Sequence, residues 1–85
     1  MEYIIEIKLL DEAGELRAKA RSADREKSWR VFYYPPGKEE TPILDCPNMP
    51  VNFGTSSALD YMKAMVKTRD KTGDDKPFEK PTSTL

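Results

Sequence analysis

Basic and aromatic residues between positions 17 and 34 are the part of this sequence best suited to binding chemistry. Three cations occupy every second position over residues 17–21, and one cation and two aromatic rings do the same over residues 30–34. Alternate residues of a β-strand point to the same side of a sheet, so both groups would share one face. Cations attract phosphates or carboxylates, and exposed rings stack on bases or pack against apolar side chains. The candidate partner-binding residues are Arg17, Lys19, Arg21, Arg30, Phe32 and Tyr34.

Residue patterns typical of catalysis or metal binding are not found in the sequence. It has no histidine, the commonest general base and neutral metal ligand. The single cysteine, Cys46, follows Asp45, whose charge opposes formation of the reactive thiolate. The pairs of adjacent acids fall in expected loops or in the tail, where carboxylates are usually solvated. We therefore expect no catalytic residue, no metal site and no cofactor, and a protein that is not an enzyme.

Length and charge limit the classes of protein that this chain can form. Its 85 residues suit one domain with a thin core, and 14 basic against 15 acidic residues leave a net charge of −1. This balance gives no overall attraction to nucleic acid or anionic lipid, so such a partner would need a local patch. One cysteine excludes an internal disulfide and favours a reducing, cytoplasmic location. No apolar run is long enough to span a membrane, and we expect no membrane partner.

The first two elements are expected to form a β-hairpin. Residues 2–10 alternate between apolar and charged side chains, which is the period of a half-buried strand. Gly14 can adopt the positive φ that a short hairpin loop needs. Residues 15–23 alternate again and place Leu16, Ala18 and Ala20 opposite the basic side chains. These residue types also favour a helix over residues 15–30, and that alternative stays open.

A third strand is expected over residues 28–34, with Trp29, Val31 and Tyr33 on one face. Consecutive prolines end it, because proline cannot donate to a β-ladder. Residues 35–54 hold five of the seven prolines and are interpreted as an irregular crossing segment, with at most a short strand over residues 41–44.

The last regular element is an amphipathic helix that Gly73 ends. Its apolar stripe consists of Ala58, Leu59, Met62, Met65 and Val66. The sequence thus predicts an α+β fold: a three-stranded antiparallel β-meander, a Pro-rich crossing segment and one C-terminal helix (βββα). Residues 1–72 would form the single domain, and residues 73–85 a flexible, disordered tail. A ββαβ-like or split arrangement, with residues 22–33 partly helical, is the alternative.

The function depends on whether Phe32 and Tyr34 are covered. The crossing segment carries large apolar side chains, so the favoured interpretation is that it folds over these two rings and leaves the cations as a solvated rim. If they are open, the first hypothesis is a small non-catalytic protein-binding module, an adaptor or inhibitor of a larger complex such as phage or mobile elements encode. The alternative is a single-stranded nucleic-acid-binding domain. A homodimer through a sheet edge at residues 1–10 is a further expectation.

Overall fold

The computed structural model of the protein describes residues 3–38, 40–50 and 55–78. Four strands precede one helix along the chain. The strands are β1 (Ile5–Leu10), β2 (Leu16–Ser22), β3 (Ser28–Tyr33) and β4 (Ile43–Pro50), and the helix is α1 (Thr55–Thr72). The α+β class and the antiparallel meander are confirmed, and residues 16–22 form a strand rather than a helix.

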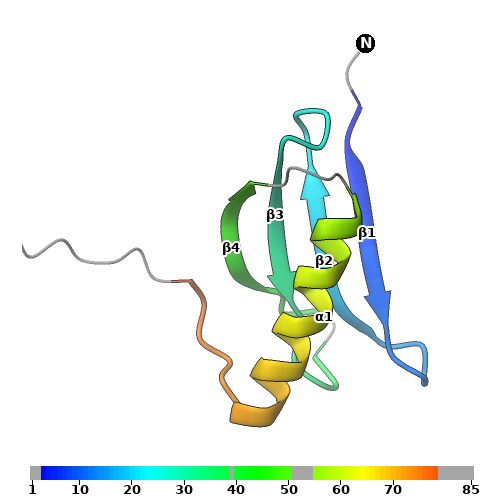
Figure 1. Ribbon diagram of the computed structural model, residues 1–85. Helices are drawn as coiled ribbons and strands as arrows, with labels where there is room; N and C mark the ends of the chain where they lie inside the picture. The colour runs from blue at the N-terminus through cyan, green and yellow to red at the C-terminus, as the bar shows by residue number, and fades with distance from the viewer. Residues whose placement is uncertain (1–2, 39, 51–54, 79–85) are drawn as a thin grey trace, which may run out of the picture.

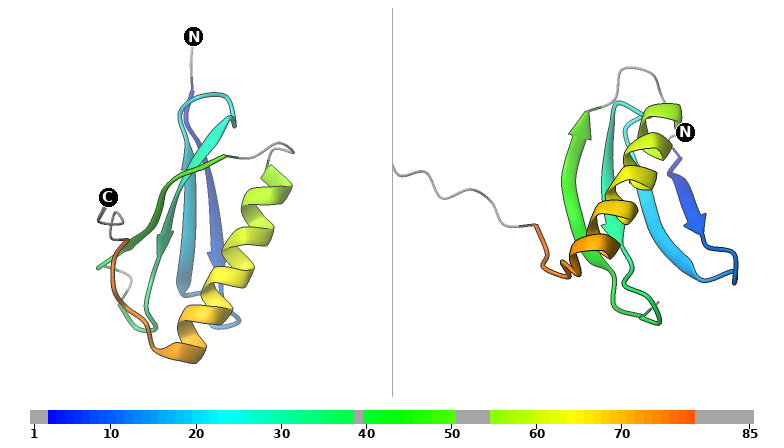
Figure 2. Two further views of the ribbon diagram at one scale, coloured as in Figure 1. Left: turned by 60° about the vertical axis from the view of Figure 1, so that its left-hand side comes forward. Right: turned by 60° about the horizontal axis from the view of Figure 1, so that its bottom comes forward.

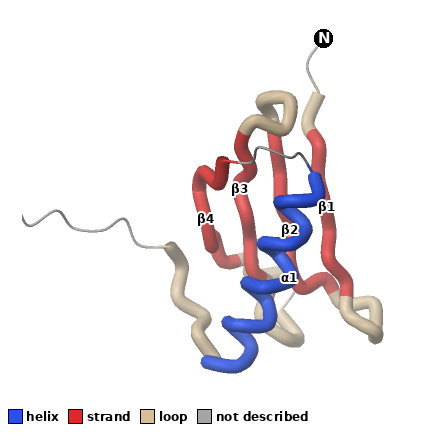
Figure 3. The backbone as a smooth tube through the Cα atoms, viewed as in Figure 1, coloured by secondary structure: helices blue, strands red, loops and turns tan. Residues whose placement is uncertain are grey.

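The strands lie side by side in their chain order, and α1 covers one face of the sheet (Figure 1; Figure 3). Every neighbouring pair of strands is antiparallel. The helix packs against β1, β2 and β3 and crosses the sheet obliquely, as the two turned views show (Figure 2). Among the described residues, no helix has the length and apolar character needed to cross a membrane.

The core lies between α1 and the inward-facing residues of the sheet. Ala18 and Ala20 are fully buried, and their small side chains leave room for Trp29, which is 1% exposed. From the helix, Ala58 and Met62 are fully buried against them. The inward face of the third strand is therefore confirmed, and so is the expected apolar stripe of the helix except at Leu59, which is not part of the core. Partly buried residues of β1 and β4 complete the core: Ile5, Ile7, Leu9, Ile43, Cys46 and Met49.

The prediction of three strands is wrong, because residues 43–50 of the Pro-rich segment form β4. This segment extends the sheet beside β3 instead of folding over its second face. Proline is tolerated in edge strands and at bulges, and β4 is an edge strand in which Pro47 lies at a register shift of its ladder with β3. Two register shifts in the β3–β4 ladder accommodate the irregular backbone. The expected short strand at residues 41–44 overlaps β4 only at Ile43 and Leu44.

A β-bulge reverses the predicted facing of Leu16 and Arg17. The β1–β2 register pairs Leu9 with Ala18 but Leu10 with Leu16, so Arg17 is the extra residue. Leu16 therefore lies opposite Leu10 on the face away from the helix, not in the core as expected. Arg17 instead reaches the C-terminal turn of α1, where its guanidinium contacts Asp70. Strict alternation places both residues wrongly, because a bulge shifts the period by one residue.

Gly73 ends α1, as the sequence predicts. Its φ of +68° suits glycine, and the N–H of Asp74 donates to the carbonyl of Arg69 in a typical helix C-cap. The chain then turns back along β4, where the N–H of Phe78 donates to the carbonyl of Leu44 at 2.7 Å (Figure 2). Residues 73–78 of the predicted flexible tail thus contact the domain, and residues 79–85 lie outside the described residues.

Candidate functional site

The face of the sheet opposite α1, here called the open face, carries most of the candidate residues. Directly paired residues of antiparallel strands share a face. The register therefore assigns Lys19 and Arg21 of β2 to the same side as Arg30 and Phe32 of β3. No described segment covers this side. Its members are Glu6, Lys8, Leu10, Leu16, Lys19, Arg21, Arg30, Phe32 and Leu44.

The open face places like charges directly opposite each other on neighbouring strands. Lys8 pairs with Lys19 across β1 and β2, and Arg21 pairs with Arg30 across β2 and β3. Such pairs destabilise a sheet. Glu6 offers partial relief, because its carboxylate lies 3.8 Å from the ammonium of Lys19. The face thus has four cations and one carboxylate, whereas the whole chain has a net charge of −1.

A depression of about 460 Å³ lies beside the two arginines of the open face. Arg21 and Arg30, which are both exposed, line it together with Pro47 of the edge strand. Asp24 of the β2–β3 loop and Ser28, the first residue of β3, also border the depression. Asp24 ties the loop to β3, since its carboxylate accepts from both the N–H and the hydroxyl of Ser28. The depression could receive an acidic side chain of a partner beside two guanidinium groups.

Two of the six sequence candidates do not lie on the open face. Arg17 faces the helix C-terminus, and Tyr34 is 4% exposed, with its N–H donating to the carbonyl of Arg17. Phe32 is half-buried on the open face, and the Lys19 ammonium lies 5.6 Å from its ring centroid. The structure therefore brings together Lys19, Arg21, Arg30 and Phe32. It adds Lys8, Leu10 and Leu44, which the same alternation could have identified once the neighbouring strands were known.

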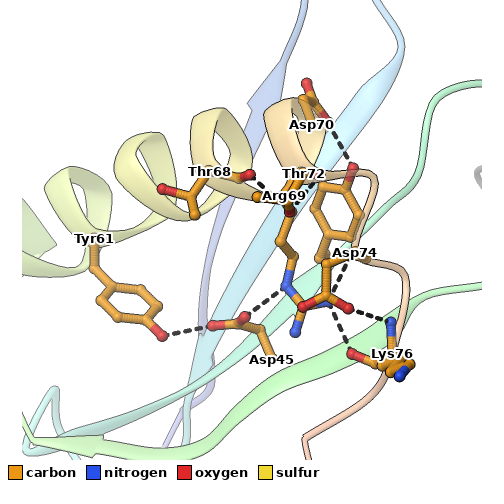
Figure 4. Close-up of polar contacts among 9 residues, drawn as sticks. Asp45, Tyr61, Thr68, Arg69, Asp70, Thr72, Asp74 and Lys76 are labelled. Atoms are coloured by element: carbon orange, nitrogen blue, oxygen red, sulfur yellow. Dashed lines mark hydrogen bonds and ion pairs between the residues drawn. The ribbon is translucent and has the colours of Figure 1, made fainter.

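A second polar cluster, formed around Arg69, joins α1, β4 and the residues after the helix (Figure 4). The Arg69 guanidinium donates from Nε to Asp45 at 2.8 Å, and from one Nη to the carbonyls of Asp74 and Lys76. Tyr61 donates its hydroxyl to the other carboxylate oxygen of Asp45 at 2.5 Å. The side chains of Arg69 and Asp45 are only 11% and 10% exposed. Every one of these contacts is internal, which indicates a structural role.

Two tyrosines in contact with the carboxylates of this region, Tyr33 and Tyr61, have raised pKa values because they are buried. Burial, and then hydrogen bonding to Asp70, raise the pKa of Tyr33 to about 12. Burial and the hydrogen bond to Asp45 likewise raise the pKa of Tyr61 above its ordinary value. Burial disfavours the charged phenolate, and a hydrogen bond donated to a carboxylate favours the neutral phenol. Both tyrosines are therefore neutral donors near neutral pH, rather than acids or bases.

Neither the cysteine nor a metal-binding cluster adds a chemical site in the described part of the chain. Cys46 is half-buried in β4 opposite Val31. Within residues 3–38, 40–50 and 55–78, no group of three or more Cys, Asp or Glu side chains is placed to hold a metal ion. No protein-family model, curated protein or solved structure matches this chain. The open face is therefore the candidate functional surface of this protein.

Proposed function

We propose that this protein is a non-catalytic protein-binding module, an adaptor or an inhibitor of a larger complex, whose open face docks on an acidic surface of its partner. The observation that carries this proposal is the pair of cross-strand like-charge pairings, Lys8–Lys19 and Arg21–Arg30. Each pairing destabilises the free fold. Two unfavourable like-charge pairings on one face, which Glu6 offsets in part, are expected where a surface serves binding rather than the stability of the free fold.

Charge and apolar area on the open face fit the anatomy of a protein interface. Carboxylates of a partner would be attracted to these cations and would lower the repulsion among them. Leu10 is 56% exposed, and Leu16 lies directly opposite it. Phe32 and Leu44 form a second apolar pair toward β4. Arginines beside apolar side chains are the composition found at the energetic centres of interfaces.

Single-stranded nucleic acid is the second candidate, because the same four cations could meet phosphates. Binding of this kind also relies on open rings that stack on bases, each worth about 1–3 kcal/mol. Phe32 is the ring on this face, and Lys19 already lies over it. Tyr34 is buried, and Arg17 is engaged with Asp70. These contacts favour an acidic protein over a base-stacking ligand.

The test compares two variants with equal changes of charge on opposite sides of the molecule. Arg21→Glu/Arg30→Glu reverses the open face, and Lys63→Glu/Lys67→Glu reverses two exposed positions of α1. We expect the wild type and the helix variant to capture the same stoichiometric acidic protein from a native lysate, and the sheet variant to lose it. Retention by the sheet variant, or the repeated absence of a stoichiometric partner, would contradict the proposal.

A labelled single-stranded oligonucleotide separates the two candidates. Fluorescence anisotropy at low salt should show no binding to the wild type if the partner is a protein. Binding that falls steeply with salt and disappears in Arg21→Glu/Arg30→Glu would replace the proposal with the nucleic-acid function. The helix variant should keep the wild-type urea midpoint to within a small shift. The sheet variant exchanges one like-charge pair for another but also sets a glutamate at position 21 opposite Glu6, so a modest decrease of its midpoint is expected.

A further inference from the structure

The two edge strands of the sheet, β1 and β4, differ in how well they are protected against pairing with an additional strand. β4 contains Pro47 and Pro50, its ladder with β3 shifts register twice, and the Leu44 carbonyl already accepts a bond from Phe78. Prolines, bulges and covering segments are the usual protection of a sheet edge. β1 has no proline, and the irregularity next to it is the extra residue of β2. Among the described segments, none pairs with its outer side.

Exposed apolar side chains are concentrated at the two ends of β1. Ile4 is 52% exposed and Tyr3 is 69% exposed before the strand, and Leu10 is 56% exposed at its end. These are three of the four large apolar side chains that are exposed in the described chain. An unprotected edge flanked by apolar side chains is a template for pairing with another strand.

We propose that β1 pairs antiparallel with β1 of a second copy of this chain, across a two-fold axis at Ile7. In this register Glu6 lies opposite Lys8 of the partner subunit, and Ile4 lies opposite the partner subunit's Leu10. On the helix side, Ile5 lies opposite Leu9 of the partner subunit. Within β1 each charge thus meets the opposite charge, and the exposed Ile4 and Leu10 meet each other, which makes the edge self-complementary. Tyr3 lies beyond the strand in this register.

Neighbouring registers lose this complementarity. An axis at Glu6 places the two copies of Glu6 opposite each other, and an axis at Lys8 does the same with the lysines. An axis between two residues would set residues of the open face opposite residues of the core face, because side chains alternate along a strand. The axis at Ile7 is therefore the register in which charge and burial agree.

Lys8 supplies an independent reason for the second copy. It lies opposite Lys19 within the sheet, and no described carboxylate is within ion-pair distance of it. In the dimer, the partner subunit's Glu6 provides the missing anion. The two-fold axis is perpendicular to the sheet, so both open faces lie on one side and form one extended basic surface. The dimer stands apart from the acidic-partner proposal, since it is measured with the pure protein alone.

Charge reversal at Lys8 tests the register by sedimentation equilibrium. In Lys8→Glu the glutamate at position 8 lies opposite Glu6 of the partner subunit, so the dimer contains two such like-charge pairs. We expect its dissociation constant to rise about tenfold or more. The monomer should stay folded, because Glu at this position faces Lys19. Glu6→Lys/Lys8→Glu restores both opposite-charge pairs and should restore dimerisation. Lys63→Glu on the exposed side of α1 is the control, with an unchanged constant.

Isotope-filtered NMR on a mixture of labelled and unlabelled chains provides a direct readout. The proposal requires nuclear Overhauser effects between Ile5 and Leu9 of the partner subunit. A wild type that stays monomeric at millimolar concentration would overturn the proposal and leave the β1 edge to a different strand. The proposal would also be overturned if Lys8→Glu left the dimer dissociation constant unchanged, or if the intermolecular nuclear Overhauser effects came from an element other than β1.

Discussion

Replacing Arg69 by methionine should be among the most destabilising single changes in this protein. Arg69 and Asp45 are each about nine-tenths buried, and they are joined at 2.8 Å. Methionine keeps much of the apolar volume but leaves the Asp45 carboxylate charged and buried, with the hydroxyl of Tyr61 still donating to it. It also removes the two bonds to the carbonyls of Asp74 and Lys76 that hold the chain after α1.

The expected cost follows from that geometry. Breaking a buried ion pair by removing one partner costs about 3–5 kcal/mol, mainly because the remaining charge is uncompensated. A domain of 85 residues has a total free energy of unfolding of about 4–13 kcal/mol, taken at 0.05–0.15 kcal/mol per residue. The substitution thus removes a large fraction of the stability. Arg69→Lys should cost less, because it keeps the charge beside Asp45 but loses the forked hydrogen bonding.

Urea unfolding followed by the fluorescence of Trp29, the single tryptophan, measures these costs. The decisive variant is Arg69→Met/Asp45→Asn, which removes the buried charge as well. We expect this double variant to be more stable than Arg69→Met alone, since a neutral amide is cheaper to bury than an unpaired carboxylate. A cost below about 1 kcal/mol for Arg69→Met, the range of a surface pair, would refute the reasoning. So would a double variant less stable than the single one.

Two pH-dependent predictions follow from the shifted pKa values. Hydrogen bonds from the hydroxyl and N–H of Ser28 hold the pKa of Asp24 at about 2, so Asp24 stabilises the fold above its ordinary pKa and ceases to do so as pH falls toward 2. Asp24→Asn should therefore lower the urea midpoint at pH 6, and the difference from wild type should shrink in acid; a constant difference would contradict this. The pKa of Tyr33 is raised, so stability declines from pH 10 upward through about 12. Tyr33→Phe should flatten that alkaline decline, and an equally steep decline would show that Tyr33 does not cause it.

Local patterns in the sequence were sufficient for the repeating parts of this fold. Alternation over residues 15–23 favoured a strand and left a helix open, and the sheet, which buries Ala18 and Ala20 completely, shows that the strand forms over residues 16–22. The apolar stripe of α1 and its end at Gly73 were equally readable, since both depend on spacing along a single element. For the same reason Lys19, Arg21, Arg30 and Phe32 could be assigned to one face in advance.

Tertiary structure alone decided the features that depend on neighbouring strands. The bulge at Arg17 exists only in the pairing of β2 with β1, and no local pattern indicates it. Prolines disfavour a strand unless it lies at the edge of a sheet, and only the pairing with β3 shows that β4 is an edge strand. Arg69 and Asp45 are 24 residues apart in sequence, and burial turns an ordinary helix-end arginine into the link between α1 and β4. Periodicity reports which side of its own element a residue faces, whereas partners, bulges and edges are set by the elements packed beside it.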